Sequence, residues 1–442
     1  MPREFRCYAP DQSLLLPPSL RDWLPEDHLG FFISDSIDAL DLSAFYARYG
    51  DEGPGRQAFD PRMMLKVLVY AYATGTFSSR KIALKLHEDV AYRVLGSDNF
   101  PAHRTISDFR QRHLPEFNDL FVQVVQTAHE VGLVKLGTVA VDGSKVKANA
   151  SKRKAMSYKR MKEEEKRLRQ EIRELMAKAK RTDDQEDKRY GKDRRGDELP
   201  AELARREDRL RMIQAARKRL EARQQEADRE KGREPGDQDR TGKPGKPFKR
   251  AFGEPEAKAQ ENFTDPDSRI MKRGSSGYEQ CYNPQIAVDG AEQIIVATAL
   301  TQSGSDVHQL EPLMEKIKET TGQHPEKTLA DAGYRSESNL QMLEEMGIEG
   351  FVAMGREKNG KAKEPNPENE ATCRMAKKMK TDRGKKHYRK RKYLAEPPFG
   401  WIKSAMGFDR FSLRGVEKVT SEWDLACLAA NLKRMHGKLA WA

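Results

Sequence analysis

The chain has 442 residues, of which 34% are charged and 37% apolar, with a formal net charge of +12 and a pI near 9.3. This length predicts two or three domains, and the basic excess predicts a polyanionic partner. The amino-terminal residues lack an apolar leader and no apolar run is long enough to span a membrane, so we expect a cytoplasmic, nucleoid-associated protein with no membrane partner. The four cysteines lie too far apart in the sequence to indicate a zinc module or a disulfide framework.

Residues 1–133 are expected to form a helical amino-terminal domain. Asp60 and Pro61 are typical of a helix start, and Gly75 of a helix end. Three further helices are expected, over 78–96, from Thr105, and over 115–132. Their basic faces are compatible with a DNA-binding helix-turn-helix or, equally well, with a helical bundle that has a solvated face.

Residues 155–231 differ in composition, because they are highly charged and nearly free of aromatic side chains. Apolar residues recur at helical spacing in two stretches, separated by a polar break at 181–198. This pattern predicts an antiparallel helical hairpin inserted into the chain, and 232–261 is expected to be a flexible linker. We interpret the hairpin as a solvent-exposed spacer in preference to a dimerisation or DNA-guiding arm.

The remaining segments, 134–154 and 262–442, alternate between strand-like and helix-like patterns. The expected strands cover 138–142, 282–289, 293–300, 328–331 and 351–354, and the expected helices cover 306–320, 336–346 and a carboxyl-terminal segment capped near Ser421. A basic loop is expected before the last helices. The fold class is therefore α/β and multi-domain, with a mixed sheet flanked by helices.

Two aspartates each follow a short apolar run. Asp142 ends the run Val139-Ala-Val, and Asp331 ends the run Thr328-Leu-Ala. A buried strand that ends in aspartate places the carboxylate at an edge of the sheet. Asp289 also precedes a glycine, but a β-rich strand follows it at once, so we interpret Asp289 as a turn residue and Asp142 as the functional one.

A third carboxylate, Glu396, precedes two prolines and is expected to open a short helix, because a helix accepts proline only in its first turn. Seven residues later, Lys403 returns to within roughly 20° of the same helix face. The stretch from Arg374 to Lys392 holds eleven lysines and arginines against one acid. A solvated loop is one interpretation of this stretch, but its position beside a carboxylate favours phosphate binding. Carboxylates are ligands that Mg²⁺ prefers, so the set predicts phosphodiester chemistry.

These motifs resemble the DDE transposases of bacterial insertion sequences. The resemblance rests on Val141-Asp142-Gly-Ser, on Ala330-Asp331-Ala-Gly-Tyr, and on the block that runs from Tyr388 through Arg391 and Glu396 to Lys403. The helical front end resembles the amino-terminal domain of InsH-type transposases. The arginine lies five residues before the glutamate, whereas the family pattern has four, and Lys392 stands at that position.

The resemblance implies a ribonuclease H-like catalytic domain that cleaves transposon ends and joins the 3′ ends to target DNA. It implies that Asp142, Asp331 and Glu396 hold two Mg²⁺ ions, with Mn²⁺ as a substitute. It also implies double-stranded DNA as partner and a homodimer in the active complex. The expected DNA-binding residues are Tyr388, Arg391, Lys392, Lys403, Lys385, Lys386 and Arg389. The alternatives are a metal-dependent nuclease of the same fold and a catalytically silent, domesticated DNA-binding protein.

Overall fold

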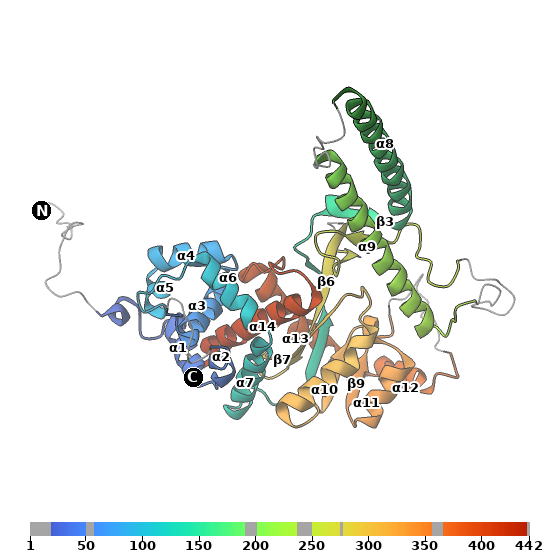
Figure 1. Cartoon of the computed structure of the whole chain (residues 1–442). Coiled ribbons are helices and arrows are strands. Elements are labelled where there is room, and N and C mark those ends of the chain that lie inside the picture. Colours follow the sequence, from blue (N-terminus) through green and yellow to red (C-terminus); the bar gives the residue numbers. More distant parts are fainter. Residues whose placement is uncertain are drawn as a thin grey trace, which may run out of the picture.

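The computed structural model of the chain describes residues 19–49, 57–190, 201–236, 250–274, 277–355 and 366–439. Within these residues a seven-stranded mixed sheet lies beside a set of amino-terminal helices, and a long helical hairpin stands away from both (Figure 1). No helix in this part of the chain is long and apolar enough to cross a membrane.

The four predicted amino-terminal helices are present with two changes, and two helices that were not individually predicted precede them. The side chain of Asp60 caps the third helix through the Arg62 and Met63 amides, as expected. The helix expected over 78–96 is instead two helices, because Asp89 adopts an extended backbone and caps the second one. The helix expected from Thr105 begins at His103. The helices are α1 (Leu29–Asp38), α2 (Ser43–Tyr46), α3 (Pro61–Ala73), α4 (Ser79–Glu88), α5 (Val90–Leu95), α6 (His103–Arg112) and α7 (Glu116–Glu130).

The main sheet confirms the expected mixed α/β architecture. Its central path runs β7-β6-β1-β8-β9, in which β6 is antiparallel to both β7 and β1, while β1, β8 and β9 are parallel. Two short strands, β2 and β5, extend β6. This order, with an antiparallel half and a parallel half that meet at β1, is a ribonuclease H-like topology. The strands are β1 (Val139–Gly143), β2 (Val146–Lys147), β5 (Arg269–Lys272), β6 (Tyr278–Asp289), β7 (Ile295–Thr301), β8 (Lys327–Ala330) and β9 (Glu349–Val352).

Alternate residues of β1 pack on opposite faces of the sheet. Ala140 packs with Leu329 of β8 and with Ala395 of α13 (Asp382–Gly400), which crosses one face. Val139 and Val141 belong to the main core on the other face, which also contains α10 (Leu310–Thr321) and α14 (Val416–Leu439). That core continues without a break into α1, α3 and α7, so the amino-terminal helices and the sheet share apolar packing.

The last helix begins at Val416, earlier than the expected cap near Ser421. The reason is that the Asp267 carboxylate accepts the Val416 amide at 3.0 Å, and a segment distant in sequence thereby satisfies the helix start. The apolar stripe of α14 is buried as predicted, and Trp423 at its centre is fully buried.

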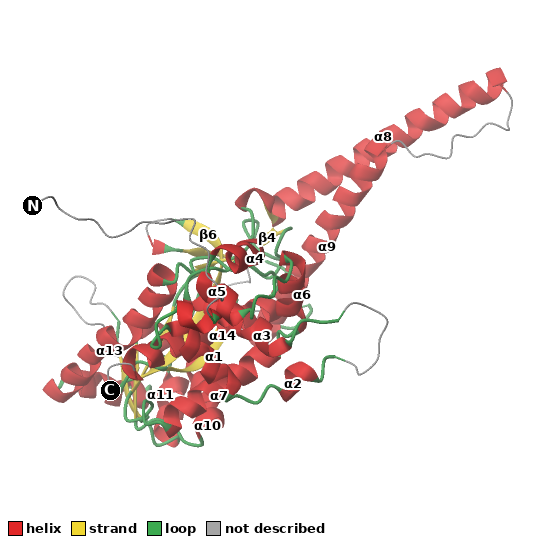
Figure 2. Ribbon diagram, turned by 90° about the vertical axis from the view of Figure 1, so that its left-hand side faces the viewer, coloured by secondary structure: helices red, strands yellow, loops and turns green. Residues whose placement is uncertain are grey.

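The charged insertion forms the predicted antiparallel hairpin, α8 (Tyr158–Tyr190) and α9 (Ala201–Glu230), which projects from the body (Figure 2). At its base β3 (Ala155–Ser157) pairs with β4 (Gln260–Asn262). The break expected at 181–198 is wrong over its first part because α8 continues to Tyr190. The rest of the break, and residues 237–249 of the expected linker, lie outside the described residues.

The basic segment is helical, contrary to the expected loop. It forms α12 (Glu370–Lys380) and most of α13, and Glu396 lies inside α13 instead of opening a new helix. Pro397 has no N–H to donate to the Tyr393 carbonyl one turn back. The Gln293 side-chain amide donates to that carbonyl instead, so the carbonyl that Pro397 leaves without a helical donor is still hydrogen-bonded.

Candidate active site

Asp142 and Asp331 lie at the same edge of the sheet. Strand β1 pairs with β8 in parallel, with Val139 opposite Thr328 and Ala140 opposite Leu329. Parallel neighbours end at the same side, so the aspartate near the end of β1 and the one just after β8 meet there. Asp142 is the fourth residue of β1, and Asp331 caps a following 3₁₀ turn, η5 (Ala332–Tyr334), by accepting the Gly333 amide at 2.7 Å.

Arg391 of α13 lies between these two carboxylates. One of its terminal nitrogens is 2.8 Å from Asp142 Oδ1 and 3.7 Å from Asp331 Oδ2. Its side chain is only 12% exposed. Arg391 was expected to bind DNA, but its guanidinium is already paired with two carboxylates, which would compete with DNA phosphates for it. By contrast, Lys392, which stands at the family's usual arginine position, is exposed.

The environment of Asp142 disfavours its charged form. Burial raises the pKa of Asp142 to about 6; the guanidinium of Arg391 opposes the rise, while the nearby charges of Asp331 and Asp306 add to it. Burial likewise raises the pKa of the Tyr388 hydroxyl, and Arg391 beside it again opposes the rise. A buried carboxyl with a strongly raised pKa beside an arginine is typical of a functional site.

Lys403 lies near Asp142, just beyond the end of α13. After α13 the chain makes a π-helical turn, η6 (Trp401–Ala405), and Lys403 in this turn donates to the Ser144 hydroxyl and to the Lys145 carbonyl. Burial lowers the pKa of Lys403 to about 8, with Arg273 adding to the decrease and Asp142 opposing it. The lysine therefore lies beside the candidate site.

Glu396 does not join the two aspartates in this structure. Its side chain is exposed and makes no hydrogen bond or ion pair with any residue that the structure describes. Across the same described ranges, no group of three His, Cys, Asp or Glu side chains is arranged to hold a metal ion. Arg391 and Glu396 are five residues apart, which places them about 140° apart around the helix axis. Arg391 therefore faces the aspartates while Glu396 faces outward.

Asp289 has the structural role predicted for it. One of its oxygens accepts the Ala291 amide at 2.8 Å within the β6–β7 turn. The other accepts the Leu136 amide, also at 2.8 Å. Neither bond places Asp289 at the edge of the sheet that carries Asp142.

Several polar residues around the site were missed by the sequence analysis. Asp306 accepts hydrogen bonds from Asn283 and Gln285 of β6, and its other oxygen is 3.6 Å from the Lys145 ammonium. Asn283 and Gln285 are both buried. The signal was present, because asparagine and glutamine interrupt the apolar pattern of a strand that was predicted to be buried.

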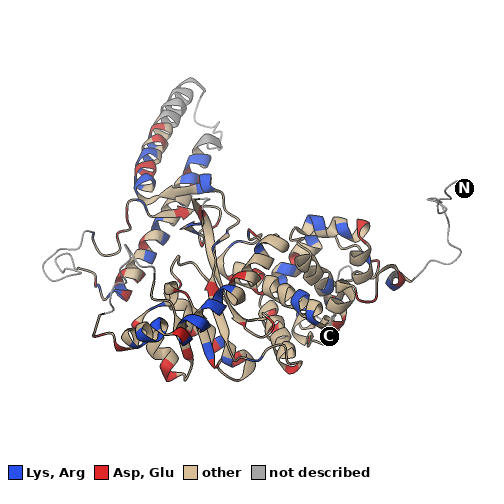
Figure 3. Ribbon diagram, turned by 180° about the vertical axis from the view of Figure 1, so that it is seen from behind, with Lys and Arg blue, Asp and Glu red and all other residues tan. Residues whose placement is uncertain are grey.

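The cations of the basic segment divide into two groups. Four of the eleven are in ion pairs with acidic residues: Arg374, Lys378, Arg383 and Arg391. The other seven are exposed and make no ion pair with a described residue; they are Lys377, Lys380, Lys385, Lys386, Arg389, Lys390 and Lys392. Figure 3 shows lysines and arginines along the helix that crosses in front of the sheet when the molecule is seen from behind. The seven form what we call the cationic face.

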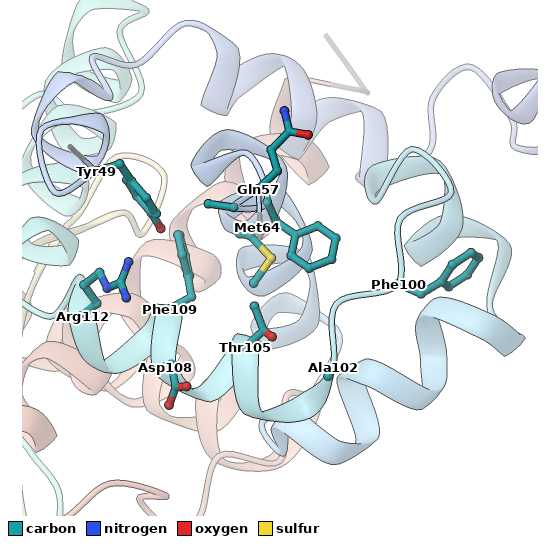
Figure 4. A pocket seen from close by; sticks show the side chains of 11 residues that line it. Tyr49, Gln57, Met64, Phe100, Ala102, Thr105, Asp108, Phe109 and Arg112 are labelled. Atoms are coloured by element: carbon teal, nitrogen blue, oxygen red, sulfur yellow. The ribbon is translucent and has the colours of Figure 1, made fainter. Parts of the chain in front are cut away.

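A separate pocket of about 540 Å³ lies among the amino-terminal helices. Figure 4 shows Tyr49 and Arg112 at one end, Phe100 at the other, and Met64 with Phe109 between them. The Arg112 guanidinium lies 5.3 Å from the centre of the Tyr49 ring. None of the residues around Asp142 lines this pocket, so it plays no part in the site.

Two segments of the chain match known protein families. Residues 246–432 match the transposase DDE domain, and residues 18–112 match a transposase domain (DUF772). Neither the curated proteins nor the solved structures that were searched give a match. The chain belongs to the DDE transposases. Asp331, Arg391, Glu396 and Lys403 lie inside the first matched segment, whereas Asp142 lies outside both and joins the site through the pairing of β1 with β8.

The two aspartates fit a divalent cation site. Both carboxylates converge on one positive group, the Arg391 guanidinium, so the fold already places two anionic oxygens around a single cationic position. Carboxylate oxygens are the ligands of hard divalent ions such as Mg²⁺, and one or two of them suffice when waters and substrate phosphates complete the shell. Transposases of this family act on DNA, which supplies such phosphates.

Proposed function

We propose that this chain is a DNA transposase that cleaves phosphodiester bonds at transposon ends and joins the 3′ ends to target DNA. The observation that carries the proposal is the convergence of Asp142 and Asp331, from adjacent parallel strands, on one cationic position. Two Mg²⁺ ions bound there would activate the attacking water or 3′ hydroxyl and stabilise the leaving oxygen. Mn²⁺ is expected to substitute.

Under this proposal the residues of the site and the cationic face have separate tasks. Asp142 and Asp331 supply oxygens for the ions, and Glu396 completes the set once DNA is bound. Lys403, held beside Asp142 through Ser144, faces the scissile phosphate and stabilises charge that develops on it. The cationic face holds the flanking DNA backbone, because its seven exposed cations make no ion pair with any acidic residue of the described chain.

The charged hairpin is less suited to bind DNA. Many of its arginines already pair with acidic residues of the hairpin or of its base; for example, Glu165 accepts from Arg169 and Arg217, and Glu261 accepts from Arg219 and Arg223. These ion pairs engage many of the hairpin's cations and leave fewer of them to bind phosphates. We therefore propose that the hairpin is a rigid spacer within the active complex, which we take to be a homodimer on double-stranded DNA.

The test uses purified protein, Mg²⁺, and DNA that carries the element's own ends. Asp142→Asn and Asp331→Asn should abolish both nicking and joining while DNA binding is kept, since removing a negative charge does not weaken phosphate attraction. Asp119→Asn, at an exposed position of α7, is the matched control and should react normally. Nicked strands without joined products would instead support a nuclease, and DNA binding without any strand breakage would support a silent DNA-binding protein.

A further inference from the structure

The pairing of β1 with β8 does not by itself fix the distance between Asp142 and Asp331. The ladder between these strands contains only two residue pairs and ends at Ala140 and Leu329. On its other side β1 pairs with β6 as far as Gly143, opposite Gln285. Asp142 is therefore held to β6, while the segment that carries Asp331 has left the sheet and needs another tether.

Tyr334 supplies a tether from the Asp331 segment to β6. This tyrosine ends the 3₁₀ turn capped by Asp331, is fully buried, and donates its hydroxyl to Gln285 Oε1. The Gln285 side chain lies directly against Gly143: a methyl group added at Gly143 would come within 2.2 Å of Gln285 Nε2. Because Gly143 has no side chain, the Gln285 side chain has space to cross β1 and reach Tyr334.

Asp306 sets the direction of this hydrogen bond. Gln285 Nε2 donates to Asp306 Oδ1 at 2.8 Å, and Asn283 Nδ2 donates to the same oxygen at 2.6 Å. An ionised carboxylate only accepts hydrogen bonds, so the amide nitrogen of Gln285 must face Asp306 and its oxygen must face Tyr334. Tyr334 is in turn obliged to donate, which gives the three side chains a single arrangement.

Gly333 allows the Asp306 carboxylate to lie close to Asp331. A methyl group built on Gly333 would lie 2.9 Å from Asp331 Oδ1 and 3.2 Å from Asp306 Oδ2. The carboxylates of Asp306 and Asp331 thus flank the same small residue. Asp306 thus adds a negative charge close to Asp331. Its own oxygens accept hydrogen bonds from Asn283 and Gln285 and lie near the Lys145 ammonium.

We propose that Tyr334, Gln285 and Asp306 are positioning residues that hold the Asp331 segment against β6 and so fix the separation of the two candidate metal-binding aspartates. None of the three is a catalytic residue. The inference rests on the proposed function, because it takes Asp142 and Asp331 to bind divalent ions. Replacing a group that hydrogen-bonds a metal ligand typically changes metal affinity about 10- to 100-fold. These three residues act on Asp331 through the backbone of its segment, so we expect the lower end of that range.

The test is Tyr334→Phe, which removes one hydroxyl and no ring atoms. The matched control is Tyr282→Phe, because Tyr282 is also fully buried and donates to a carboxylate, Asp265, with bonds of 2.9 and 3.0 Å. Both variants should lower the melting temperature by similar amounts. Only Tyr334→Phe should weaken Mn²⁺ binding to the DNA-free protein, measured by electron paramagnetic resonance titration, by about tenfold or more.

A second variant, at Gly143, tests the same contact between Gln285 and Tyr334. Gly143→Ala leaves every polar group in place but puts a methyl group where the Gln285 amide lies, so it should weaken Mn²⁺ binding as Tyr334→Phe does. The proposal is overturned if Tyr334→Phe and Tyr282→Phe bind Mn²⁺ with equal affinity. The proposed metal site itself fails, independently, if Asp142→Asn binds Mn²⁺ as tightly as the unaltered protein.

Discussion

Lowering the pH should weaken divalent cation binding, because Asp142 must be ionised to act as a ligand. Burial raises the pKa of this carboxyl to about 6, against an ordinary value of 3.8. One pH unit below its pKa, an acid is only about one-tenth ionised. Since the metal binds the carboxylate and not the acid, apparent Mn²⁺ affinity at pH 5 should be about tenfold weaker than at pH 8.

The measurement is a Mn²⁺ titration of DNA-free protein at pH 8, 7, 6 and 5, followed by electron paramagnetic resonance. An Asp142 with an ordinary pKa would be more than about 90% ionised at pH 5, so affinity would hardly change across the series. A flat series from pH 8 to pH 5 would therefore refute the claim that burial controls this carboxyl.

The same pKa predicts an effect on stability in the absence of metal. Between about pH 4 and pH 6 the folded protein keeps a proton on Asp142 that the unfolded chain has already released. The contribution of Asp142 to the free energy of unfolding should fall by about 3 kcal/mol as pH rises through this window and stay low above it. Asp142→Asn lacks this term, so its melting temperature should rise relative to the unaltered protein from pH 4 to pH 7.

Two further predictions concern the cationic face and the core. Neutralising Lys385, Lys386, Arg389 and Lys392 of the cationic face should flatten the slope of log affinity against log salt by about three to four for any DNA sequence. Neutralising four exposed hairpin arginines that are in ion pairs should not flatten it; these are Arg167, Arg169, Arg209 and Arg211. Glu422→Gln should lower stability by about 1 to 3 kcal/mol in denaturant titrations, because the buried Glu422 carboxylate accepts from the Ser412 and Leu413 amides and from Tyr72. Tyr72→Phe removes a donor to Glu422 and also the acceptor of the buried Arg110 Nη1 at 3.1 Å, so it should lower stability as well.

The positions of Asp142 and Asp331 along their own strands were predictable because the signal is local. An apolar run followed by aspartate defines where a strand ends, and both aspartates lie where this pattern places them. Their meeting at one edge was not predictable in the same way. It depends on the parallel register between β1 and β8, which are separated in sequence by the hairpin and by β6 and β7.

The errors around Glu396 have a physical reason. Proline normally ends or begins a helix because it lacks an N–H, so a helix start at Glu396 was a sound local inference. In the folded chain, Gln293, about a hundred residues away, donates to the carbonyl that Pro397 leaves without a partner. A rule based on local sequence fails where a distant side chain satisfies the backbone. The inward orientation of Arg391 was not predicted either, because a loop and not a helix was expected at that position.

Arg391 and Glu396 share one helix but cannot both face the aspartates, because five residues turn a helix by about 140° beyond a full turn. This arrangement therefore presents an internal cation to Asp142 and Asp331, and binding of Glu396 at the site requires α13 to turn or Arg391 to withdraw. Unit charges about 4 Å apart interact by about 4 kcal/mol at an effective dielectric constant of 20, so this arginine is a substantial competitor for a metal ion.

Arg391→Met should accordingly raise the Mn²⁺ affinity of the DNA-free protein. An increase of about tenfold would require only ~1.4 kcal/mol, a fraction of that interaction. The titration should be made at pH 8, since losing the guanidinium also raises the pKa of Asp142 further and would mask the gain at lower pH. Lys392→Met, on the exposed side of the same helix, is the control and should leave Mn²⁺ affinity unchanged. Equal or weaker binding by Arg391→Met would mean that the arginine supports the metal site and does not compete with it.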